Sequence, residues 1–394
     1  MLFSPIILSL SNNKYTKKTL HKPFKSFILP KFMQLNDYIK SIKQEDNPCI
    51  LYHAYCADGL CSAVIIKKAI EKILKIKINN IIAYTSYEIT EEIIRYFEEK
   101  NIKKAIFTDI SLDVYPEMVK KAEKNTELLI IDHHLFNDNL NSEKTTFIHA
   151  SLIKPEIDSS EYPASKLVYD LFSEITDIKE TNWISVIGLI SDMGYKTWKE
   201  FCHATLKEYK VKIEDNKIFR TRIGKAKGTL STALMFQNVE TEKIFKIIEE
   251  AENFEDIIKN EYLKSLQKKA SEEINKYIEL RNKSKNYNGL IIYEIKSSIR
   301  LSSTLSTILS MEYFNKNTLI IITEIPGSDT LIISARDQTR KINLNEFLKE
   351  ATKNIPNSTA GGHIPAAGAK IKKEHLETFK ENIKKLYKPY SNNN

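Results

Sequence analysis

The chain has 394 residues, of which 42% are hydrophobic and 28% are charged. This composition excludes a collagen-like chain, a disulfide-rich scaffold and a wholly disordered chain, and it is typical of a soluble globular protein with two or three domains. No uninterrupted apolar run reaches the roughly 18–20 residues that a membrane-spanning helix needs, so we expect no membrane segment. Four cysteines in this length favour a reducing compartment, and we expect a cytoplasmic protein.

The net charge of +8 is concentrated at the N-terminus. Residues 1–36 contain six lysines, no arginine and no acidic residue, so six of the eight net charges lie there. The rest of the chain is nearly neutral, and any nucleic-acid groove must come from a local arrangement of charges. We expect residues 1–44 to be an N-terminal extension that is disordered or not native, with Met33 as an alternative start. An organelle transit peptide is the other interpretation, although such peptides are usually rich in arginine.

From residue 45 onward, short apolar runs alternate with segments of helical periodicity. The pattern predicts strands at 49–53, 81–85, 105–108 and 128–131, and helices at 61–74, 88–99, 115–125, 163–173 and 183–190. This alternation indicates right-handed crossovers and a parallel sheet. We therefore expect an α/β domain over residues 45–200.

Residues 201–285 are rich in lysine and glutamate with helical periodicity, which predicts a helical connector with a solvated charged face. Lys225–Gly228 is predicted as a loop within it. A smaller α/β domain is expected over residues 286–390. Its predicted strands are 289–294, 318–324, 330–335 and 369–371, its helices are 302–313, 344–354 and 375–386, and a glycine-rich turn is predicted at 361–368.

Histidine and aspartate recur where predicted strands and helices end. A single aspartate at such a position is more often a helix cap than a ligand, but the carboxyl ends of parallel strands meet in one crevice. Carboxylates with imidazoles suit Mn²⁺ and related ions, which also relieve the repulsion between the carboxylates. Two such ions about 3.5–4 Å apart clamp the attacking and leaving oxygens of a phosphoryl transfer, so the pattern indicates two-metal phosphoester hydrolysis. The residues concerned are His53, Asp58, Asp109, Asp132, His133, His134 and Asp192.

Several motifs resemble those of the DHH/DHHA1 phosphoesterase superfamily. The segment Ile130–His134 carries the Asp-His-His sequence that names it. Two segments of the second domain, Ile333–Asp337 and Gly361–Gly368, resemble the DHHA1 substrate-binding signature, and three of the chain's ten glycines lie in the latter. Successive glycine amides approach a phosphate closely. The other matching segments are Cys56–Ala63, Phe107–Ser111, Pro163–Tyr169 and Ile187–Gly194.

The resemblance implies a parallel-sheet DHH domain, a helical connector and a smaller α/β DHHA1 domain across a cleft. It implies two Mn²⁺ ions, with Mg²⁺, Co²⁺ or Zn²⁺ as alternatives. By the resemblance, His53 binds the first ion, Asp58, His133 and Asp192 bind the second, and Asp109 bridges both. His134 contacts the scissile phosphate. Asp132 is expected to support the ligands or to lie at the strand end, without binding an ion itself. The nucleotide is held by Arg336, Gly361, Gly362, His363 and Gly368.

Cys56 departs from the family pattern, because it stands where an acidic ligand is usual. A thiolate is softer than a carboxylate and would weaken a Mn²⁺ site while favouring Zn²⁺. We nevertheless include Cys56 among the expected ligands. Cys61 is expected to be a packing residue.

The leading functional hypothesis is a metal-dependent exonuclease of the RecJ-like kind, acting on single-stranded DNA or RNA, with a 5′ to 3′ direction implied by the resemblance. The alternative is a nanoRNase, phosphoadenosine phosphatase or cyclic-dinucleotide phosphodiesterase acting on short substrates, which the absence of a further predicted oligonucleotide-binding barrel favours. A third hypothesis is an impaired family member that acts as a replication or repair scaffold. An exonuclease needs a basic groove with aromatic side chains. The segments 209–212, 219–222 and 225–227 are candidates for it, and a solvated loop is the other interpretation.

Overall fold

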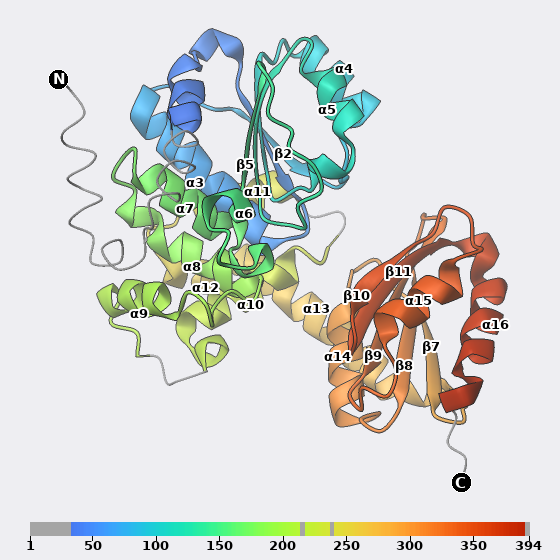
Figure 1. The fold of residues 1–394 in the computed structure, drawn as a ribbon. Coiled ribbons are helices and arrows are strands. Elements are labelled where there is room, and N and C mark those ends of the chain that lie inside the picture. The colour runs from blue at the N-terminus through green and yellow to red at the C-terminus, as the bar shows by residue number, and fades with distance from the viewer. Residues whose placement is uncertain (1–32, 213–216, 237–239, 391–394) are drawn as a thin grey trace. The chain divides into compact units, whose positions relative to one another are not determined.

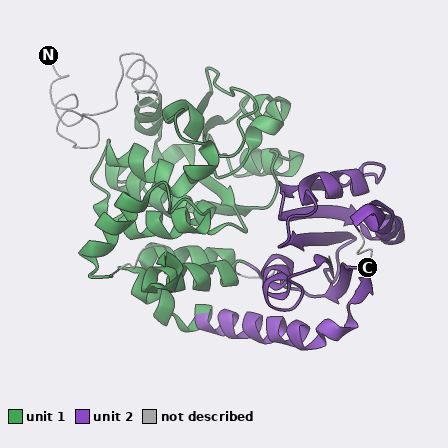
Figure 2. Ribbon diagram, turned by 60° about the horizontal axis from the view of Figure 1, so that its bottom comes forward, with its two compact units in different colours: residues 1–234, 240–263 green, residues 235–239, 264–394 purple. Residues whose placement is uncertain are grey.

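The computed structural model describes residues 33–212, 217–236 and 240–390. The chain forms two compact units, the first comprising residues 1–234 and 240–263, and the second 235–239 and 264–394 (Figure 2). The boundary between them falls in the first turn of helix α13 (Glu261–Glu279). The expected connector over 201–285 is thus helical but is divided between the two units.

The first unit is built on a five-stranded parallel sheet with the order β2-β1-β3-β4-β5. Every residue of β3 is buried, as are the central residues of β1 and β4, which explains why these strands are apolar throughout. The strand order reverses direction between β1 and β3, which is the topological switch point of such a sheet. The strands are β1 (Cys49–His53), β2 (Asn80–Tyr84), β3 (Lys104–Thr108), β4 (Glu127–Asp132) and β5 (Thr145–His149).

Helices cover both faces of this sheet (Figure 1). One face packs against α4 (Glu91–Glu99) and α5 (Pro116–Ala122), whose apolar side chains join the strand residues in one core. The other packs against α3 (Ala57–Leu74), which in turn contacts α7 (Ala164–Ser173) and α8 (Asn182–Ser191). The expected α/β fold is confirmed, and β5 is a strand that the sequence pattern did not predict.

Most of the other helices of the first unit follow α8 in the chain. They are α9 (Lys199–Glu208), α10 (Arg222–Ala233), α11 (Thr241–Glu250) and α12 (Phe254–Lys259), and the short α6 (Ala150–Ile153) follows β5. The prediction of a loop at Lys225–Gly228 is wrong, because these residues lie inside α10. Thr221 caps this helix by accepting a hydrogen bond from the Gly224 amide.

The N-terminal extension expected over residues 1–44 falls partly outside the described residues, which begin at residue 33. Residues 33–41 form a helix. Leu35 and Ile39 on it are fully buried, and the Tyr38 hydroxyl donates to the backbone carbonyls of Ala105 and Glu127. This part of the extension therefore packs against the first unit. No helix among the described residues is long and apolar enough to span a bilayer.

The second unit is a six-stranded mixed sheet with the order β10-β11-β9-β8-β7-β6. Only β7 and β8 pair in parallel. The side chains of α15 (Leu344–Thr352) and α16 (Leu376–Tyr387) fill the core on one face, and those of α14 (Ser302–Glu312) fill the core on the other. The strands are β6 (Lys285–Tyr287), β7 (Leu290–Lys296), β8 (Thr318–Glu324), β9 (Thr330–Asp337), β10 (Thr359–His363) and β11 (Ala366–Lys372).

The glycine-rich segment 361–368 is a hairpin rather than the turn that the sequence predicts. Gly361 pairs with Gly368 and Gly362 pairs with Ala367 across β10 and β11. Gly362 has φ +141°, and a Cβ there would come within 2.6 Å of the Ala366 carbonyl oxygen, so only glycine fits this strand end.

Candidate metal centre

The carboxyl edge of the parallel sheet, at the switch point between β1 and β3, gathers the predicted ligands. His53 ends β1, Asp109 follows β3, and His133 follows β4. Asp58 lies in the first turn of α3, and Asp192 is the residue after α8. All of these side chains belong to the first unit, so the site is formed within one compact body.

Asp58 is fully buried and is held by the start of α7. Its carboxylate accepts hydrogen bonds from the backbone amides of Ala164 (2.6 Å) and Ser165 (3.1 Å) and from the Ser165 hydroxyl. Gly188 on α8 makes room for this arrangement, because a Cβ there would lie 2.7 Å from Asp58 Oδ1 and 2.6 Å from Ser165 Cβ. The start of α7 therefore stabilises the buried Asp58 carboxylate and holds it in one orientation.

His133 lies among three carboxylates. Its Nε2 is 3.1 Å from Asp109 Oδ1, 3.3 Å from Asp192 Oδ2 and 3.9 Å from Asp58 Oδ2. Its Nδ1 lies 3.3 Å from the Ser159 carbonyl oxygen, to which it donates. That backbone contact fixes the ring orientation and leaves Nε2 directed at the carboxylates, as in metal-binding histidines.

Asp109 occupies a left-handed backbone conformation, with φ +62°. Its carboxylate is 1% exposed, and its Oδ2 has no hydrogen-bond partner among the described residues. This oxygen lies 4.0 Å from His53 Nδ1, and a Cβ at Gly59 would come within 2.8 Å of it. A buried, unsatisfied carboxylate oxygen on a strained residue is typical of a functional site.

The electrostatics of the cluster reflect the crowding of acids. Burial raises the pKa of Asp58 to about 7, and the nearby charges of Asp109 and Asp192 contribute to this rise against the pull of His133. Burial alone would lower the pKa of His133, but hydrogen bonds to Asp109 and Asp192 outweigh it, and this pKa lies well above its usual value. His133 is therefore protonated near neutral pH, and its positive charge offsets part of the negative charge of the carboxylates around it.

His134 is paired behind this cluster with Asp132, at 2.8 Å from Nδ1 to Oδ1. Burial would lower the pKa of His134, but the Asp132 charge and hydrogen bond raise it to about 9. Burial would raise the pKa of Asp132, but His134 lowers it to about 2. Both side chains are therefore charged near neutral pH.

Cys56 caps α3, because its sulfur accepts a hydrogen bond from the Asp58 amide. Its thiol also donates to Asp192 Oδ1 at 3.7 Å. Burial raises the pKa of this thiol, as do the charges of Asp109, Asp192 and Asp58. Cys56 is therefore a neutral thiol near neutral pH. Cys61 is fully buried within α3 and packs in the interior of the unit.

The donor set fits divalent cations. Three groups of side chains each place their ligand atoms within 4.8 Å of one another, and two of the groups share Asp109 while two share His133. The orphaned Asp109 Oδ2 and the raised pKa of Asp58 are both relieved by a cation. The three groups are His53 with Cys56 and Asp109, Asp109 with His133 and His134, and Asp58 with His133 and Asp192.

The residues predicted to hold the substrate lie in the second unit. Arg336 on β9 is opposite Ala366 of β11, which in turn pairs with His363 of β10. The Arg336 guanidinium donates to the Ala335 carbonyl oxygen (2.8 Å) and the Ser303 hydroxyl (3.0 Å). Gly361, Gly362 and Gly368 lie on the same hairpin, so the predicted substrate residues occupy neighbouring strands.

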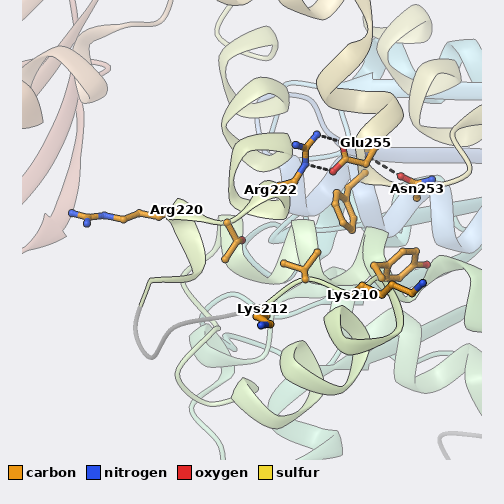
Figure 3. Close-up of a pocket in the computed structure, with 10 residues that line it drawn as sticks. Lys210, Lys212, Arg220, Arg222, Asn253 and Glu255 are labelled. Carbon is orange, nitrogen blue, oxygen red and sulfur yellow. Dashed lines mark hydrogen bonds and ion pairs between the residues drawn. The ribbon is translucent and has the colours of Figure 1, made fainter.

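Two of the three basic segments predicted as a nucleic-acid groove, 209–212 and 219–222, contribute residues to the lining of a cavity of about 610 Å³ in the first unit (Figure 3), and the third, 225–227, does not. Lys210, Lys212 and Arg220 contribute to its lining. Arg222 forms a two-pronged ion pair with Glu255, and Figure 3 shows Arg220 extending away from that pair. The pairing reduces the positive charge of the cavity, and the groove stays a prediction.

Sequence reasoning missed several residues of the site. Ser165 holds Asp58 from a helix more than a hundred positions away, and Tyr87 places its ring 5.4 Å from that of His53. The segment 225–227, predicted as a loop and as part of a basic groove, lies on α10 instead. The family resemblance of Pro163–Tyr169 was the one available signal, and it pointed to the helix that holds Asp58.

The DHHA1 domain model matches residues 291–388 of the chain. No curated protein matches it in sequence. Among solved structures, a DHH-domain protein described as a member of the s1p family of ribosomal proteins is 16% identical, with a TM-score of 0.65 over 93% of this chain and 92% of that chain. RecJ from Thermus thermophilus in complex with Mn²⁺ is 13% identical, with a TM-score of 0.60 over 91% of this chain and 54% of that one.

CDC45 from Entamoeba histolytica is 11% identical, with a TM-score of 0.55 over 91% of this chain and 99% of that one. At these low sequence identities, the TM-scores show that the chain and these structures share a fold. The fold extends over both units, and the DHHA1 match falls in the second of them. The chain therefore contains a segment that matches the DHHA1 domain, and it shares the fold of the DHH-domain and RecJ structures.

Proposed function

We propose that this protein is a divalent-metal-dependent phosphodiesterase that hydrolyses single-stranded nucleic acid from an end. The observation that carries the proposal is the gathering of carboxylates and imidazoles from separate elements of the first unit, with ligand atoms within 4.8 Å in three overlapping groups. Asp109 Oδ2 is buried without a hydrogen-bond partner, which is unfavourable in a purely structural ion-pair cluster. A bound cation would supply the missing partner.

The ligand roles follow from the groups. His53, Cys56 and Asp109 would hold one ion, and Asp58, His133 and Asp192 the other, with Asp109 close to both. When bound, two divalent ions generate hydroxide near neutral pH and screen the charge of the phosphate. RecJ of T. thermophilus has been solved with Mn²⁺ and with Mg²⁺, which supports either ion here, and we propose Mn²⁺ because the donors include imidazoles.

His134 is the side chain that we expect to contact the reacting phosphate. The hydrogen bond to Asp132 orients the ring and keeps it protonated near neutral pH, because the pKa of His134 is about 9. About a third of the side chain is exposed, so it is accessible to substrate. We propose that it donates a charge-assisted hydrogen bond to an oxygen of the scissile phosphate.

Aromatic side chains beside the ligands support a nucleotide substrate. The rings of Tyr55 and Tyr87 lie 6.4 Å and 5.4 Å from the His53 ring, and Tyr87 is 44% exposed. Exposed aromatic rings next to a phosphodiester site stack with bases. Arg336 and the 361–368 hairpin are proposed to hold the nucleotide in the second unit.

Short substrates are the second candidate, because no additional oligonucleotide-binding barrel occurs among the described residues. A scaffold function at a replication or repair complex is a third, since the fold is shared with CDC45. The nearly complete donor set favours catalysis over a scaffold.

The test is incubation of the protein with Mn²⁺ and end-labelled oligonucleotides, from dinucleotides to long single strands, together with cyclic dinucleotides. Progressive loss of long strands from one end is the expected result, and the label position gives the direction. Cleavage confined to dinucleotides or cyclic dinucleotides would replace the proposal with the second candidate. No turnover with any divalent ion, in protein that binds Mn²⁺, would support the scaffold.

A further inference from the structure

His149 ends β5 at the edge of the parallel sheet where the neighbouring strands place their candidate metal ligands. It lies opposite Asp132 of β4, the residue that precedes His133. His149 is fully buried, yet it belongs to none of the three groups of side chains whose ligand atoms lie together. Its hydrogen bonds show what it does at this edge instead.

Both ring nitrogens of His149 form hydrogen bonds within the first unit. Nδ1 accepts a hydrogen bond from the backbone amide of Ser151 at 3.2 Å, so the proton of the neutral ring is on Nε2. Nε2 donates to the backbone carbonyl oxygen of His134 at 2.9 Å. Neither nitrogen is left for a metal ion, and the ring instead holds the backbone of the Asp-His-His segment.

Ser159 holds the same segment from another part of the chain. It begins a short 3-10 helix, Ser159–Glu161, and is half-buried. Its hydroxyl donates to the His134 carbonyl oxygen at 3.0 Å, which is the acceptor that His149 also uses. Its own carbonyl oxygen accepts from Nδ1 of His133 at 3.3 Å. Ser159 therefore contacts both histidines of the Asp-His-His segment.

These two histidines are central to the proposed function. His133 belongs to two of the three groups of candidate ligands, and His134 is the side chain expected to contact the phosphate. A shift of their backbone would move the His133 ring away from Asp109 and Asp192, which lie 3.1 Å and 3.3 Å from its Nε2. Side chains that orient metal-binding residues in this way typically change metal affinity or activity by about 10–100-fold when they are replaced.

We propose that His149 and Ser159 are positioning residues, which hold His133 towards the cation and His134 towards the reacting phosphate by fixing the His134 carbonyl oxygen. The part that concerns the phosphate rests on the proposed function. The part that concerns the cation requires only that the site binds a metal ion.

The alternative is that the two side chains only stabilise the fold, because a buried carbonyl oxygen needs a donor in any protein. The two roles differ in their effect on metal binding. If His149 and Ser159 are purely structural, removing their donors lowers the free energy of unfolding and leaves the Mn²⁺ affinity of the folded protein unchanged. If they are positioning residues, the Mn²⁺ affinity falls as well.

The experiment uses two pairs of variants, in which one member keeps the hydrogen-bond donor and the other removes it. Ser159→Thr keeps the hydroxyl and Ser159→Ala removes it, while the backbone carbonyl that orients His133 stays in both. His149→Gln keeps a side-chain N–H, and His149→Met removes it at similar volume. Ser160→Ala is the matched control, because the exposed Ser160 hydroxyl donates to Asp158 Oδ1 (2.7 Å) at the start of the same short helix.

Mn²⁺ affinity is measured from the electron paramagnetic resonance signal of free Mn²⁺, and urea unfolding in a chelator gives the stability of each variant. We expect Ser159→Ala and His149→Met to weaken Mn²⁺ binding by on the order of 10-fold. Ser159→Thr and His149→Gln should retain most of the affinity, and Ser160→Ala should match wild type. At saturating Mn²⁺, the variants without the donor should lose on the order of 10–100-fold in turnover number on an end-labelled oligonucleotide, with a smaller change in the Michaelis constant.

Unchanged Mn²⁺ affinity in folded Ser159→Ala and His149→Met would overturn the proposal, even if both variants were less stable to urea. An equal loss of affinity in Ser160→Ala, or in both members of each pair, would overturn it too. The proposed function is tested separately by turnover. A protein whose Mn²⁺ affinity depends on the two donors but which cleaves no phosphodiester refutes the hydrolase alone. A protein that hydrolyses oligonucleotides, and does so normally in Ser159→Ala and His149→Met with unchanged Mn²⁺ affinity, refutes the positioning role alone.

Discussion

Asp58→Asn should stabilise the metal-free protein while weakening its response to metal. Asp58 is fully buried, and burial with the neighbouring acids raises its pKa from 3.8 to about 7. At pH 8 its ionised form is therefore unfavourable in the folded state by up to about 4 kcal/mol, at 1.36 kcal/mol per pKa unit. The neutral amide of the asparagine removes this unfavourable contribution to the free energy of folding. It also loses one of the hydrogen bonds from the start of α7, which costs about 1–3 kcal/mol. The expected net gain is about 2 kcal/mol.

The sign of the pH dependence follows from the raised pKa. A carboxyl whose folded-state pKa is above its unfolded value contributes stability that is fully present below pH 3.8 and is lost as the pH rises through about 7. The advantage of Asp58→Asn in the presence of a chelator should therefore grow between pH 5 and pH 8. With Mn²⁺ at 100 times its dissociation constant, wild type should gain about 2.7 kcal/mol, and Asp58→Asn should gain less, so the difference closes or reverses.

Urea unfolding followed by tryptophan fluorescence measures the stability of the first unit, which contains Asp58. The sequence has two tryptophans, Trp183 and Trp198, and both lie in the first unit. Asp170→Asn is the matched control, because the Asp170 carboxylate pairs with Lys166 and accepts from the Tyr162 hydroxyl at 2.7 Å. That control should be destabilised at pH 8 and should keep the full Mn²⁺ response. A variant Asp58→Asn that is less stable than wild type in chelator at pH 8 would refute the electrostatic reasoning.

Three further substitutions test individual residues. Asp109→Ala should abolish metal-dependent turnover, with a loss above the roughly 10–100-fold that residues behind a metal ligand cost; near-normal rates in the oligonucleotide assay would contradict its role between the two ligand groups. Cys56→Asp should preserve or raise Mn²⁺-dependent activity, whereas a loss of activity in Cys56→Asp with tolerance of Cys56→Ser would mean that the thiol packs and caps α3 rather than binding metal. His363→Ala should raise the Michaelis constant more than it lowers the turnover number, and steady-state kinetics showing a pure loss of turnover would instead place His363 at the reacting phosphate.

The edge of the sheet was predictable because the strands there are short, apolar and followed at once by polar residues. β3 ends before Asp109 and β4 ends at Asp132, which match the sequence pattern. β5 was missed because its sequence, TTFIH, has only two strongly apolar residues and no clear alternation. The sequence shows which side chains stand at strand ends, and the parallel topology then brings those ends together.

Contacts between segments that are distant in the chain could not be predicted from the sequence pattern. Nothing near Asp58 indicates that the amides of Ala164 and Ser165 will hold its carboxylate, since the contact joins residues 106 and 107 positions apart. The error at Lys225–Gly228 has a local cause. Gly224 and Gly228 lower the helical propensity there, and the buried positions of α10 are partly small alanines that give a weak apolar periodicity.

The left-handed backbone of Asp109 has a practical consequence for anyone who engineers this protein. Asp109, itself a candidate ligand, has φ +62°, and Met193, which follows the candidate ligand Asp192, has φ +63°; such conformations cost about 1–3 kcal/mol each in residues other than glycine. Libraries screened only for expression yield or heat tolerance would therefore enrich replacements at these positions that relax the chain. Clones that replace Asp109 would lose a candidate ligand while gaining stability, so a screen has to include a metal-dependent readout from its first round.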